Sequence, residues 1–388
     1  MNQGKYVFAQ ISAFLPQRVF DRIVANHKGN YRVRHFSCWN QMMCMMFGQL
    51  SNRDSLSDLI VTVNAHTSKF YHLGFGKGVS KANLAKSNEN RDFRIYQQFS
   101  EHLIAVAREV CLQDEANAFS FANAVYAFDS TTIDLCLSVF CWATFRRAKG
   151  AVKLHTQYDV RTLIPVFVDV TAASVHDVNG LDKISYEAGS FYVFDRGYMD
   201  FKRLYFIHQA ESFFVIRARN NLKFERRSSA TVDKTTGVKC DQLGILRVFY
   251  SAKGYPEKIR RIKFYDAEQK RTFIFLTNNL ELKPEEIASI YKHRWKVELF
   301  FKWIKQHLKI KAFWGRTENA VKTQVYIAVI TYTLVAIIKE KLKTNYSTYE
   351  ILQILGASLL DKTPINQLLQ KKNSQDVKEL LSNQLKIF

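Results

Sequence analysis

Four short runs of strand-forming residues between residues 120 and 195 constrain the fold of this chain most. Valine, phenylalanine, tyrosine and threonine dominate these runs, and such residues favour β-strands. The runs read AVYAFDSTTIDLCL, AVKLHTQYDV, LIPVFVDVTAASV and SFYVFDRGY. Two helix-like segments, DVNGLDKISYEAG and DFKRLYFIHQAE, lie around the fourth run. Three neighbouring strands, a helix and a further strand are the order of an RNase H-like α/β domain.

The segments on either side predict three regions. Residues 1 to about 115 carry apolar residues at helical spacing, and a further helical region runs from Lys283 to about Lys341. Residues 217–276 are basic and strand-prone, which indicates a β-rich insertion within the α/β domain. We therefore predict a helical N-terminal region at 1–117, an α/β domain at 118–345 and a helical C-terminal region at 346–388.

The charge of the chain predicts a polyanionic partner. Lysine and arginine number 56 against 35 acidic residues, a formal net charge of +21. Nucleic acid is the first candidate and an anionic membrane surface the second. The longest apolar run, from Val325 to Ile338, is too short to span a bilayer and predicts a buried core helix. The six cysteines form no CxxC pair, so the sequence favours free thiols over a zinc site or a disulfide framework.

A basic segment near residue 80 is a candidate DNA contact in the N-terminal region. Ser80 is positioned to cap a short helix that follows it. The cations around this helix suit DNA phosphates, and a solvated basic loop fits the pattern equally well; they are Lys77, Lys81, Lys86, Arg91 and Arg94.

Two aspartates follow apolar runs that predict buried central strands. Asp129 follows AVYAF, and Asp195 follows SFYVF. Carboxylates just past such strands can converge at one edge of an open α/β sheet. An isolated aspartate at this position is more often a turn residue or a helix cap. His155 and the pair His176–Asp177 fall near the same strands as secondary candidates.

A third carboxylate lies on a predicted helix among basic and phenolic residues. Tyr291, Arg294, Glu298 and Lys305 have helical offsets that place them within about 60° of one another, at ~100° per residue. A carboxylate beside two cations suits a metal-bound phosphate, because the acid can hold the metal while the cations bind phosphate oxygens. By itself, such a stripe is more often a solvated salt-bridge face.

The three acids together point to a hard divalent cation. They lie in a chain without a cluster of histidine and cysteine ligands, and Mg²⁺ prefers oxygen ligands. Two ions about 3.5–4 Å apart could activate a water or a 3′-hydroxyl and stabilise the leaving oxygen. We therefore predict Asp129, Asp195 and Glu298 as catalytic, metal-binding residues for two Mg²⁺ ions, with Mn²⁺ as a substitute.

The spacing Tyr291-x2-Arg294-x3-Glu298-x6-Lys305 resembles the Y-R-E-K signature of bacterial insertion-sequence DDE transposases of the IS-four group. The Asp129-Ser-Thr and Asp195-Arg-Gly-Tyr segments look like the two aspartate motifs of that group. The resemblance implies a cytoplasmic, nucleoid-associated bacterial enzyme that acts as a homodimer, without a membrane partner. It implies endonuclease cleavage at terminal inverted repeats and strand transfer into target DNA, by cut-and-paste through a hairpin. The implied DNA contacts are Tyr291, Arg294, Lys305, Arg196 and Lys302.

Hairpin-forming relatives use a tryptophan in the insertion to hold a flipped base, and none of the five tryptophans of this chain lies there. We expect an aromatic substitute, with the candidates Phe224, Phe249, Tyr250, Tyr255, Phe264 and Tyr265. Two alternatives stay open: an RNase H-like nuclease without strand transfer, and a non-catalytic DNA-binding descendant. A basic membrane-surface or RNA-binding protein would leave the Tyr-Arg-Glu-Lys stripe without an explanation.

Overall fold

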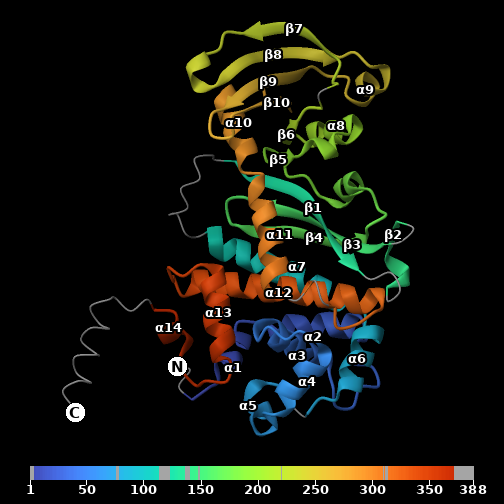
Figure 1. Cartoon of the computed structure of the whole chain (residues 1–388), viewed down its shortest axis with the longest axis vertical. Helices are drawn as coiled ribbons and strands as arrows, with labels where there is room; N and C mark the ends of the chain where they lie inside the picture. Colours follow the sequence, from blue (N-terminus) through green and yellow to red (C-terminus); the bar gives the residue numbers. More distant parts are fainter. Residues whose placement is uncertain are drawn as a thin grey trace, which may run out of the picture. The chain divides into compact units, whose positions relative to one another are not determined.

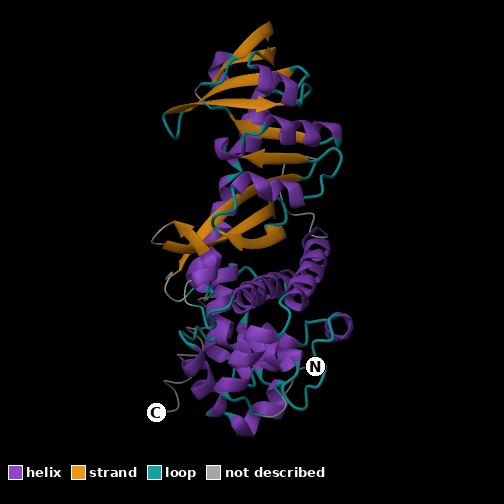
Figure 2. Ribbon diagram, turned by 90° about the vertical axis from the view of Figure 1, so that its right-hand side faces the viewer, coloured by secondary structure: helices purple, strands orange, loops and turns teal. Residues whose placement is uncertain are grey.

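The computed structural model describes residues 4–75, 78–112, 123–135, 140–146, 149–219, 221–308, 310 and 313–370. The chain forms two compact units. A helical unit combines residues 1–113 with 303–388, and a sheet unit comprises residues 114–302. Figure 2 distinguishes them by their helices (purple) and strands (orange). The boundary falls inside one helix, whereas the sequence-based division placed residues 303–345 with the α/β domain.

The helical unit forms where the sequence shows helical spacing (Figure 1). Hydroxyl residues begin several of its helices: Ser37, Ser55, Ser80 and Thr317 each accept a hydrogen bond from a backbone N–H of the first turn. The predicted capping role of Ser80 is thus confirmed. The helices are α1 Val7–Ser12, α2 Gln17–Asn26, α3 Cys38–Leu50, α4 Leu56–Asn64, α5 Phe70–Leu73, α6 Lys81–Asn90, α7 Arg94–Leu112, α12 Glu318–Lys341, α13 Thr348–Ser358 and α14 Ile365–Leu368.

Helix α12 is the core of the helical unit. It packs against α7, α3 and α6, and its residues from Val325 to Ile338 are buried. By length and composition α12 could cross a membrane, but 94% of its apolar window is buried inside the protein. Burial by neighbouring helices accounts for its apolar character, and the expected core helix is confirmed.

The sheet unit contains the predicted strand runs. Its strands are β1 Val125–Leu135, β2 Thr144–Arg146, β3 Lys149–Asp159, β4 Ile164–Ala172, β5 Phe191–Phe194, β6 Phe213–Arg217, β7 Phe224–Ala230, β8 Val238–Leu246, β9 Ile259–Asp266 and β10 Arg271–Thr277. Its helices are α8 Phe201–Gln209, α9 Phe249–Gly254, α10 Pro284–Lys292 and the first part of α11 Trp295–His307. The helical region predicted from Lys283 to about Lys341 is therefore three helices, α10, α11 and α12.

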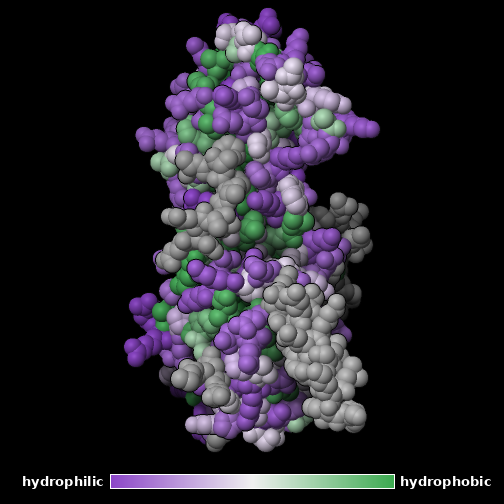
Figure 3. All heavy atoms as spheres, turned by 90° about the vertical axis from the view of Figure 1, so that its left-hand side faces the viewer, coloured by the Kyte–Doolittle hydropathy of each residue, from purple (hydrophilic) through white to green (hydrophobic). Residues whose placement is uncertain are grey.

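The strands form one mixed sheet in the described part of this unit, with the order β2-β3-β1-β5-β6-β10-β9-β8-β7 and β4 paired to β3. Strands β4, β3 and β1 are antiparallel neighbours, whereas β1, β5 and β6 run parallel. The sequence between the second aspartate and the third acid thus continues the same sheet through β10, β9, β8 and β7. Hydrophilic residues cover much of that end of the molecule in Figure 3.

Strand β5 is buried on both faces, as its continuous apolar sequence requires. One face carries an aromatic core that includes Tyr126, Phe128, Tyr192 and Phe194, with α8 packed against it. Helix α10 contacts β5, β6, β8 and β9. Side chains alternate along a strand, so Asp129 and Asp195 both project from the face opposite the aromatic core.

Candidate active site

The parallel register between β1 and β5 brings the two predicted aspartates level with each other. Val125 pairs with Phe191 and Ala127 with Val193, and the same offset aligns Asp129 with Asp195. Asp195 follows β5 directly, as predicted. The prediction that Asp129 ends its strand was wrong, because β1 continues to Leu135 through its antiparallel pairing with β3. Asp129 instead lies beside the point where β5 ends.

Asp129 lies in a mostly buried position, with a side chain that is 20% exposed. The backbone N–H of Ser130 donates to its Oδ1 at 2.8 Å, and the Tyr198 hydroxyl donates to the same atom at 3.5 Å. The pKa of Asp129 is raised to about 6, chiefly by burial and also by the charges of Glu298 and Asp195, against the opposing effects of Ser130 and Arg294. The charges of Asp195 and Glu298 therefore act on the Asp129 carboxylate.

Ser130, the residue next to Asp129, is held by a hydrogen-bonded group that contains Asp177 and the buried Lys153. Lys153 forms an ion pair with Asp177 at 2.9 Å and donates to the Val175 carbonyl, and the Ser130 hydroxyl donates to Asp177 at 2.7 Å. Burial would raise the pKa of Asp177, but the bonds from Ser130 and Lys153 outweigh it and hold the pKa below its usual value. The secondary candidate Asp177 thus contacts the residue that holds Asp129.

The other secondary candidate, His155, is fully buried on β3. Its Nε2 lies 2.9 Å from the Thr171 hydroxyl, and burial lowers its pKa. His155 therefore lies in the core of the sheet, away from solvent.

Arg294 joins two of the acids. Its Nη1 donates to Asp129 Oδ2 at 3.1 Å, and its Nη2 donates to Glu298 Oε1 at 2.6 Å. Its Nε is buried without a hydrogen-bond partner among the described residues. Burial alone would lower the pKa of Arg294, but the neighbouring tyrosine and carboxylates outweigh it and raise the pKa above its usual value. Glu298 is 54% exposed and therefore open to a ligand from solvent.

Tyr291 contacts the remaining acid. Its hydroxyl donates to Asp195 Oδ1 at 3.4 Å, and burial together with the Asp195 charge raises its pKa to about 12. The prediction of one continuous helix was wrong here. Helix α10 ends at Lys292 and α11 begins at Trp295, with i to i−3 hydrogen bonds between them, including Arg294 N–H to Tyr291 O at 3.0 Å. Tyr291 thus comes from the last turn of α10 and Arg294 from the tight turn that follows it, and the two side chains contact different acids.

The donor chemistry of the three acids fits a hard divalent cation, since each supplies carboxylate oxygens. Their present arrangement does not assemble such a site. Among the described residues no group of three His, Cys, Asp or Glu side chains is placed to hold a metal ion. The guanidinium of Arg294 forms ion pairs with Asp129 and Glu298 instead.

The other predicted DNA contacts lie on two elements. Arg196 is exposed directly after Asp195, and its carbonyl accepts a hydrogen bond from Arg219 at 3.4 Å. Lys302 is exposed on α11, and Lys305 is half-buried in the last turn of the same helix. Because Lys305 belongs to the helical unit, the structure leaves its role as a prediction.

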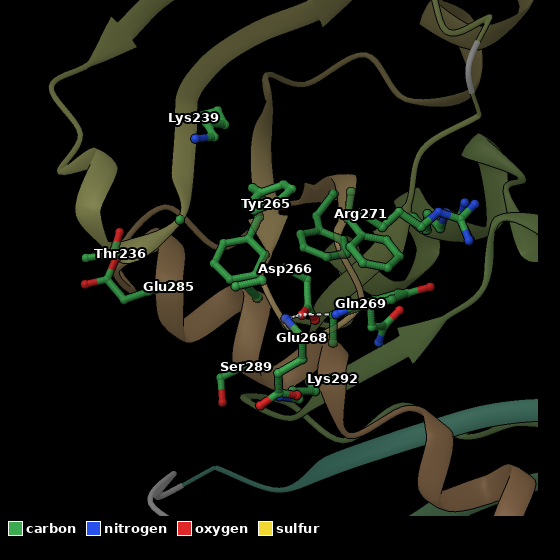
Figure 4. Close-up of a pocket in the computed structure, with 18 of the residues that line it drawn as sticks. Thr236, Lys239, Tyr265, Asp266, Glu268, Gln269, Arg271, Glu285, Ser289 and Lys292 are labelled. Atoms are coloured by element: carbon green, nitrogen blue, oxygen red, sulfur yellow. Dashed lines mark hydrogen bonds and ion pairs between the residues drawn. The ribbon is translucent and has the colours of Figure 1, made fainter.

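A groove of about 970 Å³ lies within the sheet unit and is lined by Asp195, Tyr291 and Arg294 among other residues. Figure 4 shows Lys239 and Tyr265 from β8 and β9, together with Glu285, Ser289 and Lys292 from α10. The lining cations outnumber the lining acids. The cations are Arg217, Lys234, Lys239, Arg271, Lys292 and Arg294; the acids are Asp195, Asp266, Glu268 and Glu285.

Aromatic residues line the same groove. The lining shows which candidates for base stacking lie beside the site and which do not. Phe264 and Tyr265 belong to the lining, whereas Tyr255 is 1% exposed and bonded to His208, which excludes it as a stacking platform. Trp295, 48% exposed, also lines the groove. Sequence reasoning missed Trp295 because it considered only the insertion, although Trp295 directly follows Arg294. Phe273, over which the guanidinium of Arg217 lies at 5.3 Å, was missed as well.

Curated relatives of this chain are named as transposases. The y4zB protein of Sinorhizobium fredii is 36% identical over 54% of this chain and 59% of its own length. The protein named for insertion sequence element IS5377 of Geobacillus stearothermophilus is 29% identical over 64% of this chain and 66% of its own. The chain thus matches less than two thirds of either relative. The protein named for element IS4SA of Synechocystis is 23% identical over 74% of this chain and 80% of its own.

A solved synaptic complex of piggyBac transposase with hairpin DNA aligns with 96% of this chain and 84% of that chain. The TM-score is 0.44 and the identity 11%, a likeness too weak to carry a conclusion. Residues 3–76 match a family described only as a domain of unknown function, DUF4372. Residues 121–334, more than half of the chain and all three candidate acids, match the family described as "Transposase DDE domain", and the chain belongs to that family.

Proposed function

We propose that this chain is a DNA transposase that cleaves transposon ends and joins them to target DNA by cut-and-paste transposition. One observation carries the proposal. Asp129 and Asp195 are level on one face of the sheet, and Arg294 joins Glu298 to Asp129 beside a basic groove. Membership of the transposase DDE domain family supports the same conclusion.

We assign metal binding to Asp129, Asp195 and Glu298, with two Mg²⁺ ions per site and Mn²⁺ as a substitute. When bound, such ions supply activation of a water or a 3′-hydroxyl and stabilisation of the leaving oxygen. The chain itself supplies orientation. One buried N–H of Arg294 has no partner among the described residues, and the planar fork of this side chain suits phosphate oxygens. Tyr291, Lys305, Arg196 and Lys302 are the further proposed DNA contacts.

The finer architecture is part of the same proposal. The order β4-β3-β1-β5-β6, antiparallel for three strands and parallel for the last two, supports an RNase H-like domain. The partners are terminal inverted repeats and target DNA, bound by a homodimer in the bacterial cytoplasm at the nucleoid. The helical N-terminal region is the proposed second DNA-binding part.

The hairpin step requires a place for a base outside the duplex. The groove beside Asp195 offers aromatic faces from Tyr265, Phe273 and Trp295 together with cations. Base–aromatic stacking contributes about 1–3 kcal/mol per base, which is comparable to the cost of unstacking. We expect Trp295→Ala to reduce hairpin product, seen on denaturing gels, while first-strand nicking persists. Equal loss of both products would remove the stacking role. Phe249→Ala, at an exposed residue of α9 that does not line the groove, is the matched control.

The function is tested with DNA that flanks the coding region. Labelled 3′-hydroxyl ends from that DNA are incubated with the full chain, Mg²⁺ and a supercoiled plasmid. We expect labelled ends joined to the plasmid, with no joined product from the Glu298→Gln variant. Cleavage without any joined product would contradict transposition and support the nuclease alternative. Binding without cleavage would support the non-catalytic descendant.

A further inference from the structure

A surface loop of the helical unit combines positive charge with an absence of acids. Between Asp21 and Asp54 the sequence contains no aspartate or glutamate. The chain turns between α2 and α3 in this stretch, at residues 27–35, which we call the basic loop. The loop exposes Lys28, Arg32, Arg34 and, at 68% exposure, Tyr31.

Lys28, Arg32 and Arg34 have no acidic partner in the part of the chain that the structure describes. No ion pair or hydrogen bond joins the side chains of Lys28, Arg32 or Arg34 to another described residue, and Arg32 lies over the Tyr31 ring at 5.1 Å. Arg91 and Arg94, which the sequence suggested as DNA contacts, do have partners. Arg91 donates to the carbonyls of Phe36 and Ser37, and Arg94 forms an ion pair with Asp92 at 2.6 Å. Of the other predicted cations, Lys77 lies outside the described residues.

The backbone of the basic loop is held firmly despite its exposure. Asn30 Oδ1 accepts from the Cys38 N–H at 2.8 Å, and the Gly29 N–H donates to Val24 O at 2.9 Å. His27 lies 3.1 Å from Gln98 on α7. Gly29 also packs so closely that a Cβ there would lie 2.5 Å from Ile95 Cδ1. The loop is therefore fixed to α7 and α3 while its cations face solvent.

Two of these cationic residues adopt left-handed backbone conformations. Lys28 has φ 51° and Arg32 has φ 56°, which cost free energy for residues that carry a Cβ. Strained backbone that the surrounding structure maintains is concentrated at binding sites. Here the strain falls on residues whose side chains make no ion pair with any residue that the structure describes.

We propose that the basic loop is a phosphate-binding site for double-stranded DNA, with Lys28, Arg32 and Arg34 as its contacts. This inference rests on the proposed function, which supplies DNA as the polyanion. Arginine and lysine neutralise phosphates along the duplex, and a preorganised loop loses little conformational entropy on binding. The site lies inside the domain of unknown function at residues 3–76 and gives that domain a role.

The test removes three charges at the loop and three elsewhere in the same unit. The loop variant is Lys28→Gln/Arg32→Gln/Arg34→Gln. The matched control is Lys341→Gln/Lys343→Gln/Lys362→Gln, at exposed lysines at the end of α12 and in the segments after α12 and α13. The full chain binds a fluorescent 40-base-pair duplex of random sequence, followed by anisotropy from 0.05 to 0.3 M KCl. Thermal melting verifies that both variants are folded.

For the loop variant we expect the slope of log K against log salt to fall by about 2.7, because each lost phosphate contact removes about 0.9. With the two affinities equal at 1 M KCl, this corresponds to a loss of affinity on the order of 500-fold at 0.1 M KCl. The control should retain most of the wild-type slope. Equal effects of the two variants would mean that only the total positive charge of the protein matters, and this result would overturn the proposed site. Tighter loop-dependent binding to the same duplex made of RNA, or to phosphatidylserine vesicles, would also overturn it.

The result distinguishes a failure of the loop assignment from a failure of the proposed function on which that assignment rests. If the wild type binds duplex DNA steeply with salt and the loop variant matches it, only the loop assignment fails. If the wild type does not bind duplex DNA at any salt concentration, the proposed function fails and the loop assignment fails with it.

Discussion

Arg294 Nη1 lies 3.1 Å from Asp129 Oδ2 although 165 residues separate them in the chain. The same guanidinium holds Glu298 at 2.6 Å. Arg294 therefore provides the positive charge for two carboxylates that a divalent cation would otherwise share. A cation and Arg294 compete for the same oxygens, whereas a DNA phosphate would draw Arg294 away from them.

Arg294→Gln should raise the affinity of the DNA-free protein for Mn²⁺, since both carboxylates lose their resident cation. We expect at least about a tenfold change, the equivalent of 1.4 kcal/mol. Titration calorimetry or Mn²⁺ spin resonance measures it without any activity assay. Lys253→Gln, an equal change of charge at an exposed residue of α9, should leave the affinity unchanged. Unchanged Mn²⁺ affinity in Arg294→Gln would contradict the competition.

Glu298→Gln should abolish cleavage yet preserve DNA binding. The amide keeps the shape of the side chain but removes the anionic charge with which it would hold a cation. Cleavage is followed on labelled DNA, and binding is followed by anisotropy. Glu281→Gln, an exposed acid that precedes α10, serves as the control. Wild-type cleavage by the Glu298 variant would exclude this residue as a ligand.

Asp129→Asn should stabilise the metal-free protein at pH 8. The folded-state pKa of Asp129 is about 6, above the ordinary value of 3.8, so ionisation of this group destabilises the fold as pH rises through that interval. The full effect is about 3 kcal/mol at 1.36 kcal/mol per pKa unit, reduced by the lost contact with Arg294.

Calorimetric melting in EDTA at pH 4, 5, 6 and 8 measures the effect. The advantage of the variant should be present at pH 8 and diminish toward pH 4. A destabilised variant at pH 8 with a flat pH response would contradict the assigned pKa.

The buried ion pair between Arg260 and Asp241 should stabilise the part of the sheet that is formed by β7 to β10. Its Nη2–Oδ2 distance is 2.7 Å, and both side chains are almost fully buried. Arg260→Met leaves Asp241 buried without its partner, and we expect a loss of about 3–5 kcal/mol in the free energy of unfolding. Urea denaturation measures it. The double variant Arg260→Met/Asp241→Leu should recover most of the loss, and failure to recover would assign the effect to packing.

Much of the local structure could be predicted from the sequence because it depends on neighbours in the chain. The strand runs around Asp129 and Asp195, the cap at Ser80 and the core helix from Val325 to Ile338 all form where their patterns predicted. The predicted single helix from Tyr291 to Lys305 did not form. Helical periodicity gives no information on the tight turn at Arg294, whose side chain bonds to a distant strand.

The sequence by itself determined which residues are the candidates for the chemistry: three acids and their phenolic and basic companions, in a chain with a large excess of positive charge. Only the tertiary structure decided how they meet. The parallel register of β1 and β5 aligns Asp129 with Asp195, and packing decides which cations have hydrogen-bond or ion-pair partners, as Arg91 and Arg94 do, and which have none among the described residues, as in the basic loop. The physical reason is that propensity and charge are properties of residues, whereas register, burial and ion pairing depend on contacts between segments far apart in the chain.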